Sequence, residues 1–300
     1  MRQPDTRIVL GLHRSRHERG LLESALDLGI RTIDTAFNYA GFRSHAILFQ
    51  TAADLLPCFF VSTKVGFFPG AGGRNDHSLE PGRLQDALET TAATLGQAPD
   101  VVFLHNPERS LGDLEPAHAA DHLAAAAGVL TDAVAAGLCR SWGISTWNPQ
   151  PVLAAAIAVG PRGLVRPWCL MHRAGILVPA RVLDAIDDLA GCLEVETERR
   201  WGMSPFGGDT GDSVWRTLAL RPFMAAGEEC STAAAAFRLA FALPPVGRVA
   251  VGTNRPEHLA DLVRALDLGV DGHNVERYRD MLARRQAHAV AGSRGGVAAG

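Results

Sequence analysis

The sequence lacks the features that mark secreted and membrane-spanning proteins. Its five cysteines are scattered over 300 residues, are odd in number and include no C-x-x-C pair, which is typical of reduced thiols rather than of disulfides. No apolar run approaches the roughly 18 residues of a membrane span. The N-terminal segment also lacks the apolar core of a signal peptide. We therefore expect a cytoplasmic protein with reduced thiols and no membrane partner.

A strongly charged segment is absent as well. Lysine and arginine number 29 against 32 aspartates and glutamates, the net charge is -3, and no block of basic residues occurs. This balance makes nucleic acid a poor candidate partner. Apolar residues make up 47% of the chain and charged residues 20%, which is typical of a globular protein that can bury a sizeable core.

Short apolar or β-branched runs alternate with longer amphipathic or alanine-rich runs along the chain. A parallel sheet with crossover helices requires this order. The predicted strands are Ile8–Leu12, Arg31–Thr35, Phe59–Thr63, Val101–Leu104, Ser141–Ser145, Val165–Leu170, Trp201–Ser204 and Arg248–Val251. Eight strands, each followed by a helical run, predict an α/β protein with a closed (β/α)8 TIM barrel.

In several of the predicted helices apolar residues recur at helical spacing, so one face can pack on the barrel. The predicted helices are His17–Leu28, Arg43–Leu55, Leu79–Leu95, Ala117–Ala136, Pro151–Val159, Ala180–Ala190, Ser231–Leu243 and Pro256–Leu268. The segment 193–200 fits either the end of a helix or the start of a strand. No linker divides the chain, so we expect one barrel domain over residues 1–288 and a flexible Gly/Ala-rich tail at 289–300.

Polar residues stand at the ends of three consecutive predicted strands, where a barrel enzyme carries its chemistry. Asp34 ends the second strand, Lys64 follows the third and His105 follows the fourth, while Tyr39 lies five positions beyond Asp34. Taken singly, each has an ordinary structural explanation, such as an ion pair between strands or a surface aromatic residue. Together they favour a device that transfers a proton to a carbonyl oxygen.

The chemistry of that device follows from the residue types. A free tyrosine has a pKa of about 10 and is a poor acid near neutrality. A nearby Lys64 ammonium would lower the pKa of Tyr39, and Asp34 would keep the lysine charged and oriented. His105 could then hydrogen-bond the carbonyl oxygen. The sequence thus predicts Asp34, Tyr39, Lys64 and His105 as catalytic residues.

These segments resemble the aldo-keto reductase family, and the resemblance covers most of the chain. LDLGIRTIDTAFNY is similar to the family segment that carries Asp and Tyr, VSTKVG to the lysine strand and VVFLHNPE to the histidine strand. GLCRSWGISTWNP, GMSPFGG and VGTNRPEHL resemble the fifth, seventh and eighth strand segments. The resemblance implies an NAD(P)H-dependent reductase, and the absence of a G-x-G-x-x-G motif agrees with a family that uses no Rossmann domain.

The resemblance also implies where the cofactor binds. Ser145 and Thr146 would meet the nicotinamide carboxamide, and Ser204, Pro205 and Phe206 would line the pyrophosphate side. The residues implied near the adenosine phosphate are Thr253, Arg255, His258 and Asp261. Hydroxyls, a guanidinium and the start of the last predicted helix are suitable phosphate donors. Arg255 is the main reason to expect NADPH rather than NADH.

Several positions depart from the family pattern. Thr146 stands where the family has asparagine, and the sixth strand lacks the usual glutamine. Leu262 replaces a common adenine-binding asparagine, and His258 stands where many members have arginine. The run AGFRSHAIL after Tyr39 differs from the familiar Gly-x-Ser-Glu pattern. These changes remove specific cofactor contacts without removing the four catalytic candidates.

We expect reduction of a small aldehyde or ketone to an alcohol, with the reverse oxidation also catalysed. Two alternatives remain open: a non-catalytic, cofactor-binding regulatory subunit, and a barrel enzyme that uses the site for dehydration or epimerisation. His13 with His17, and His118 with His122, have the i, i+4 spacing of metal ligands, but no third ligand is evident and we expect no metal. Phe67 and Phe68 are candidate walls of a substrate pocket.

Overall fold

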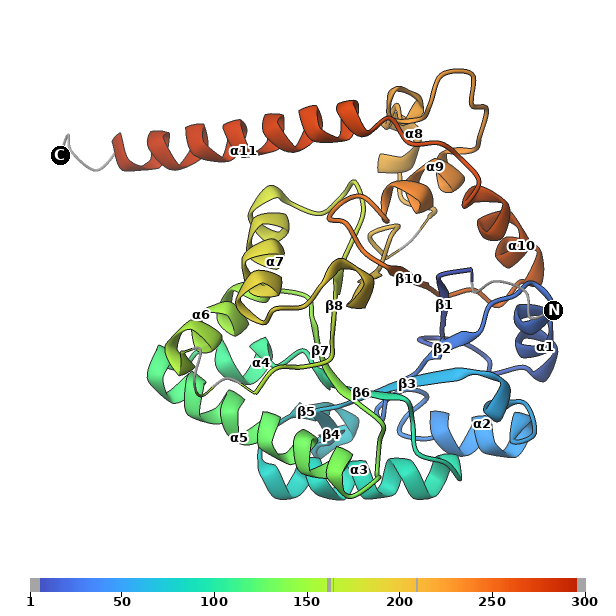
Figure 1. The fold of residues 1–300 in the computed structure, drawn as a ribbon, viewed down its shortest axis with the longest axis vertical. Helices are drawn as coiled ribbons and strands as arrows, with labels where there is room; N and C mark the ends of the chain where they lie inside the picture. Colours follow the sequence, from blue (N-terminus) through green and yellow to red (C-terminus); the bar gives the residue numbers. More distant parts are fainter. Residues whose placement is uncertain (1–5, 161–162, 164, 209, 296–300) are drawn as a thin grey trace.

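The computed structural model describes residues 6–160, 163, 165–208 and 210–295. Within them, eight parallel strands close into a barrel in the order β1-β10-β9-β8-β7-β6-β3-β2 (Figure 1). The barrel strands are β1 Ile8–Gly11, β2 Thr32–Asp34, β3 Phe60–Val65, β6 Val101–His105, β7 Trp142–Thr146, β8 Cys169–Arg173, β9 Arg200–Met203 and β10 Arg248–Val251. The predicted single-domain (β/α)8 barrel is confirmed.

Helices surround the barrel, one after nearly every strand (Figure 1). They are α1 Arg19–Asp27, α2 Ser44–Ala52, α3 Pro81–Leu95, α5 Pro116–Ala135, α6 Pro149–Val159, α7 Ala180–Cys192, α9 Thr232–Leu239 and α10 Pro256–Ala265. Two short helices, α4 Glu108–Leu111 and α8 Val214–Thr217, lie in loops. The last helix, α11 Gly272–Gly295, projects from the barrel in Figure 1. Of the flexible tail expected at 289–300, residues 289–295 belong to α11 instead, and residues 296–300 lie outside the described residues.

One strand lies later in the chain than its sequence pattern predicts. We expected the sixth strand at Val165–Leu170, but β8 runs from Cys169 to Arg173. Pro167 explains the shift, because proline has no N–H to donate to a central strand of a parallel sheet. The apolar character of Val165 had suggested strand, yet its side chain is exposed.

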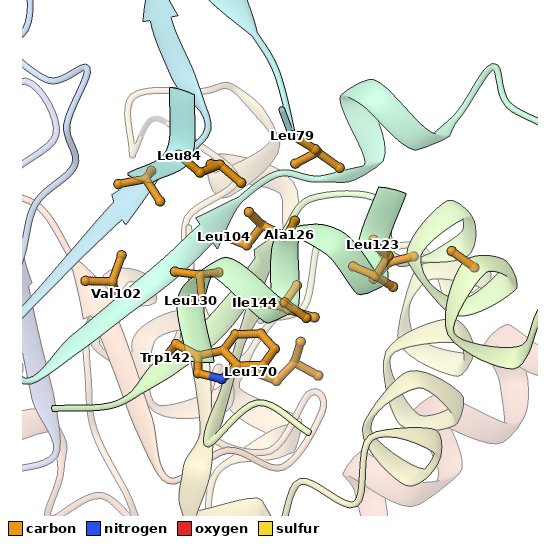
Figure 2. Close-up of a cluster of buried hydrophobic side chains, with 14 of the residues drawn as sticks. Leu79, Leu84, Val102, Leu104, Leu123, Ala126, Leu130, Trp142, Ile144 and Leu170 are labelled. Carbon is orange, nitrogen blue, oxygen red and sulfur yellow. The ribbon is translucent and has the colours of Figure 1, made fainter. Parts of the chain in front are cut away.

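Figure 2 shows part of the apolar layer between the barrel and its helices, where Leu104, Leu130, Trp142 and Leu170 lie close together. A smaller cluster fills the inside of the barrel, with Phe103 from β6 and other residues from β1, β6, β8, β9 and β10. The interior is therefore a packed core, and open space is left only at the ends of the strands.

Gly143 on β7 is required by this internal packing. A Cβ atom there would lie 2.5 Å from the carbonyl oxygen of Cys169 and 2.8 Å from the ring of Phe103. We expect Gly143→Ala to lower the free energy of unfolding by about 1–3 kcal/mol, measured by urea denaturation. Gly128→Ala is the control, since open space surrounds Gly128 in α5 and the change should raise stability by about 0.5–1 kcal/mol. Equal stability of the two variants would contradict the packing argument.

A small hairpin stands apart from the barrel and was missed by the sequence patterns. Strands β4 Phe67–Pro69 and β5 Asn75–His77 pair antiparallel directly after β3. The intervening glycine-rich run gives no alternating pattern, so no strand was predicted in this segment. It contributes to one wall of the cavity described next.

Candidate active site

The carboxyl ends of all eight barrel strands border a cavity of about 630 Å³. The four residues predicted to transfer a proton, Asp34, Tyr39, Lys64 and His105, all line this cavity. The topology explains their proximity, because β2, β3 and β6 are successive neighbours in the barrel. The four side chains meet at one cavity because the strands of a parallel barrel end on one face.

Lys64 is a buried ammonium held by two oxygen acceptors. Its side chain is 2% exposed, and Nζ donates to Oδ2 of Asp34 and, at 2.9 Å, to the carbonyl oxygen of Thr35. Oδ1 of Asp34 accepts a bond of 2.8 Å from Ser62 Oγ. Burial alone would lower the pKa of Lys64, but the charge of Asp34 and contact with Tyr39 outweigh burial and raise the pKa. The lysine therefore keeps its charge inside the cavity.

Tyr39 lies half-buried in the loop between β2 and α2. Nζ of Lys64 is 5.2 Å from the centroid of its ring, and the ring of His13 is 4.9 Å away. Burial raises the pKa of Tyr39, and the charge of Lys64 acts in the opposite direction without cancelling it. We expected Lys64 to lower this pKa, and burial dominates instead. Tyr39 consequently keeps its proton at neutral pH, as a proton donor must.

The loop that carries Tyr39 is anchored at its far end by buried hydroxyls. Oγ of Ser44 bonds both Nε2 of His17 and Oγ1 of Thr35, each at 2.6 Å. Within the loop Phe42 has a left-handed φ of +66°, which costs energy for a bulky residue and requires such anchoring. The unusual sequence after Tyr39 therefore still leaves Tyr39 at the cavity. In the described part of the chain no three His, Cys, Asp or Glu residues gather as a metal site.

His105 is buried at the end of β6, with its ring centroid 6.2 Å from that of Tyr39 in an edge-on arrangement. Its Nδ1 is buried and has no hydrogen-bond partner among the described residues, so Nε2 is the nitrogen available to the cavity. Burial, with help from the charge of Lys64, holds the pKa of His105 well below its usual range. The imidazole is thus neutral and can donate one N–H to a carbonyl oxygen.

Most of the residues implied for the nicotinamide and pyrophosphate border the same cavity, namely Ser145, Ser204, Pro205 and Phe206. Thr253, implied near the adenosine phosphate, borders it as well. Oγ of Ser145 is buried and lacks a partner in the described chain, which marks it as a site for a polar ligand atom. Ser204 has a left-handed φ of +56°, and strain of this kind in a non-glycine residue is concentrated at functional sites.

Thr146 does not border the cavity. Its Oγ1 donates to Oε2 of Glu108 at 2.9 Å, and Oε1 of the same carboxylate accepts from the backbone N–H groups of Trp147 and Asn148 at 2.7 and 3.1 Å. Burial raises the pKa of Glu108, and these hydrogen bonds act against the rise. Because Glu108 comes from another loop, no pattern around Thr146 predicts where its hydroxyl points.

Asn106 lines the cavity beside Ser145 and was missed by sequence reasoning. Its backbone N–H donates to the carbonyl oxygen of Ser145 at 2.7 Å, and its Oδ1 is buried without a partner among the described residues. A polar residue directly after a strand was the signal used for His105, and the same signal would have found Asn106. His13, Arg14 and other loop residues also line the cavity, with no comparable sequence signal.

A second hollow of about 490 Å³ lies at the start of α10 and is lined by Arg255 and His258, among others. Asn254 lines both this hollow and the main cavity, so the two adjoin. Next to it, the backbone N–H of Arg255 donates to Oγ1 of Thr253 at 3.1 Å. Asp261, one turn further along α10, borders neither space and pairs with Arg264 at the surface. Arg255 and His258 therefore lie where an anionic group could meet the positive end of the helix dipole.

Residues 14–159 match the model of the Aldo/keto reductase family. No curated protein matches the sequence. In the described residues, no helix is both long and apolar enough to cross a membrane.

Solved structures share the fold. An aldo-keto reductase from Bacillus halodurans in its holo form is 16% identical, with a TM-score of 0.69 over 92% of this chain and 91% of that chain. A Pseudomonas aeruginosa protein assigned to the aldo-keto reductases is 20% identical, with a TM-score of 0.61 over 87% of this chain and 91% of that chain. Both are similar to this chain in fold. Residues 14–159 thus match the sequence model of the aldo-keto reductase family, and the closed barrel of the chain is similar in fold to these solved aldo-keto reductases.

Proposed function

We propose that this protein is an NADPH-dependent reductase of a small aldehyde or ketone, with Tyr39 as the proton donor. The observation that carries the proposal is the buried, charged Lys64–Asp34 pair beside Tyr39 and a neutral His105 at one cavity. An ion pair that is buried at a cavity, rather than in the core or on the surface, is typical of a site with a chemical task. We also propose a cytoplasmic location, since all five cysteines are free.

Each of the four residues has a separate role in the proposed reduction, set by its charge state. Nε2 of His105, as an N–H donor, binds and polarises the carbonyl oxygen of the substrate. Tyr39 gives its proton to that oxygen as negative charge develops, and the Lys64 ammonium stabilises the tyrosinate that remains. Asp34 holds the ammonium in place and keeps it charged. Bound NADPH would supply the hydride for the carbonyl carbon.

The cavity fits a nicotinamide cofactor through polar atoms that lack partners in the described chain. The Ser145 hydroxyl and the side chain of Asn106 would meet the carboxamide, which needs both a donor and an acceptor, and their unpartnered atoms at the cavity support this. Ser204 with Pro205 and Phe206 would line the pyrophosphate side. We also propose Thr146 and Asp261 as cofactor contacts, and each now bonds a partner within the protein, Glu108 and Arg264 respectively.

The test of the cofactor is a fluorescence titration with NADPH and NADH. We expect Arg255→Gln to weaken NADPH binding about ten- to a hundredfold, because a charge-assisted bond to phosphate contributes about 1.5–3 kcal/mol. NADH binding should change little, since NADH has no 2′-phosphate. Arg140→Gln is the control, because Arg140 is an exposed residue paired with Asp100 just before β7. Equal loss of both cofactors in Arg255→Gln would contradict the NADPH preference, and no binding by the unaltered protein would overturn the proposed cofactor.

A further inference from the structure

The hairpin formed by β4 and β5 reaches the catalytic histidine candidate from outside the barrel. Phe67 of β4 and His77 of β5 face each other in the hairpin register, and the N–H of Ser78 closes the hairpin on the carbonyl oxygen of Gly66 at 3.0 Å. Both Phe67 and His77 then contact His105 of β6. The hairpin therefore adds contacts to His105 beyond the pairing of β3 with β6 in the barrel.

Both ring nitrogens of His77 are engaged. Nε2 lies 2.8 Å from the backbone carbonyl oxygen of His105, and Nδ1 lies 2.7 Å from Oγ of Ser110. Since a carbonyl only accepts, Nε2 must carry the proton, and the Ser110 hydroxyl then donates to Nδ1. Burial lowers the pKa of His77, the bond to His105 opposes this, and Arg109 adds to the lowering. His77 is thus a neutral ring with one defined tautomer.

Phe67 lies between the two imidazoles. Its ring centroid is 4.8 Å from that of His77 and 4.8 Å from that of His105, both in edge-on geometry. His105 needs this support, because its Nδ1 has no hydrogen-bond partner among the described residues. In most positioned histidines the second nitrogen is bonded and fixes the ring, whereas here ring contacts and the backbone must do so.

Gly66 shows how closely the hairpin approaches β6. A Cβ atom there would lie 3.2 Å from the carbonyl oxygen of His105 and 3.4 Å from Nε2 of His77, and its φ is +134°. A side chain there would crowd the carbonyl oxygen of His105, and the positive φ favours glycine. Both observations agree with a glycine at the point where the hairpin meets β6.

We propose that His77 is a positioning residue that fixes the His105 imidazole, through the His105 carbonyl group and through the Phe67 ring. The expected effect on catalysis rests on the proposed function. The contact between His77 and His105 does not depend on that function. His77 touches neither substrate nor cofactor in this scheme. Its effect on turnover comes entirely from the orientation of His105.

The first arm of the test measures turnover with 4-nitrobenzaldehyde and NADPH. We expect His77→Leu to lower kcat about ten- to a hundredfold, because a misplaced catalytic group can cost that much, with NADPH affinity unchanged. His77→Gln should restore most of kcat, since its side-chain amide can still donate to the His105 carbonyl. Ser110→Ala, a milder change, should lower kcat less than His77→Leu. His118→Gln on the exposed side of α5 is the control.

The second arm needs no activity. Histidine 15N NMR spectra are recorded for the protein without ligand. In the unaltered protein we expect the His77 ring to have its proton on Nε2. The His105 ring signals should shift in His77→Leu and remain unchanged in His77→Gln. If His77→Leu keeps full kcat and leaves the His105 signals unchanged, the hairpin is only an anchor and the proposal is overturned. If His77→Leu does not fold, kcat and the His105 signals are compared between Ser110→Ala, which should change both, and His77→Gln, which should keep both. Absence of turnover in the unaltered protein would refute the reductase, while the NMR arm would still decide the positioning.

Discussion

Replacement of Tyr39 by phenylalanine is expected to abolish carbonyl reduction and to leave NADPH binding intact. The change removes only the hydroxyl, so the ring keeps its contacts with His13 and Lys64. A positioned general acid contributes about a hundred- to ten-thousandfold to the rate, and we expect a loss of that size in kcat. NADPH consumption measures the rate, and a fluorescence titration measures the binding.

The chain offers a matched control for this change. It has two tyrosines, and the hydroxyl of the other, Tyr278 of α11, donates to the carbonyl oxygen of Ile176 at 3.0 Å without bordering the cavity. Tyr278→Phe should lose some stability and keep its kcat. If Tyr39→Phe keeps full turnover, another group donates the proton and the reductase mechanism is wrong. Cofactor binding without turnover in the unaltered protein would favour the regulatory or the dehydration and epimerisation alternatives.

Lys64→Met is expected to destabilise the protein as well as to inactivate it. Both partners of the ion pair are almost fully buried, with side-chain exposures of 2% for Lys64 and 7% for Asp34. Removal of one partner of such a pair costs about 3–5 kcal/mol, because it leaves a buried charge without compensation. Urea denaturation measures this loss as a fall in the free energy of unfolding.

The double variant separates this effect from loss of packing. In Asp34→Asn/Lys64→Met no charge is left unpaired, so the double variant should be more stable than Lys64→Met alone. Arg140→Gln again serves as the control, because its pair with Asp100 is 77% exposed on the arginine side and should contribute at most about 1 kcal/mol. A Lys64→Met variant that is as stable as the double variant would show that the charge of Asp34 is compensated in another way.

The local patterns of the sequence located most barrel strands because each strand is a short apolar run bounded by turns. The segment 193–200, which fitted two structures, resolves into Leu193 and Val195 packed in the core and a strand that begins at Arg200. The prediction of the sixth strand was wrong in its position. The composition around Val165 resembles a strand, but Pro167 keeps this segment out of the sheet, and β8 begins at Cys169. The β4–β5 hairpin was not predicted because its sequence has no alternating pattern. Its contacts are with β6 and α4, through His77.

The sequence by itself determined the barrel and the approach of Asp34, Lys64 and His105, because residues at the ends of neighbouring parallel strands must meet on one face. Only the tertiary structure decided how these groups behave. Burial, which no local pattern records, reverses the expected direction of the Tyr39 pKa and keeps His105 neutral. Partners from distant segments decide which hydrogen bonds form. The hydroxyl of Thr146 donates to Glu108, and His77 donates to the carbonyl oxygen of His105. Hydrogen bonds between residues far apart in the chain depend on the packed fold, so the sequence could name the catalytic candidates but not the contacts that orient them.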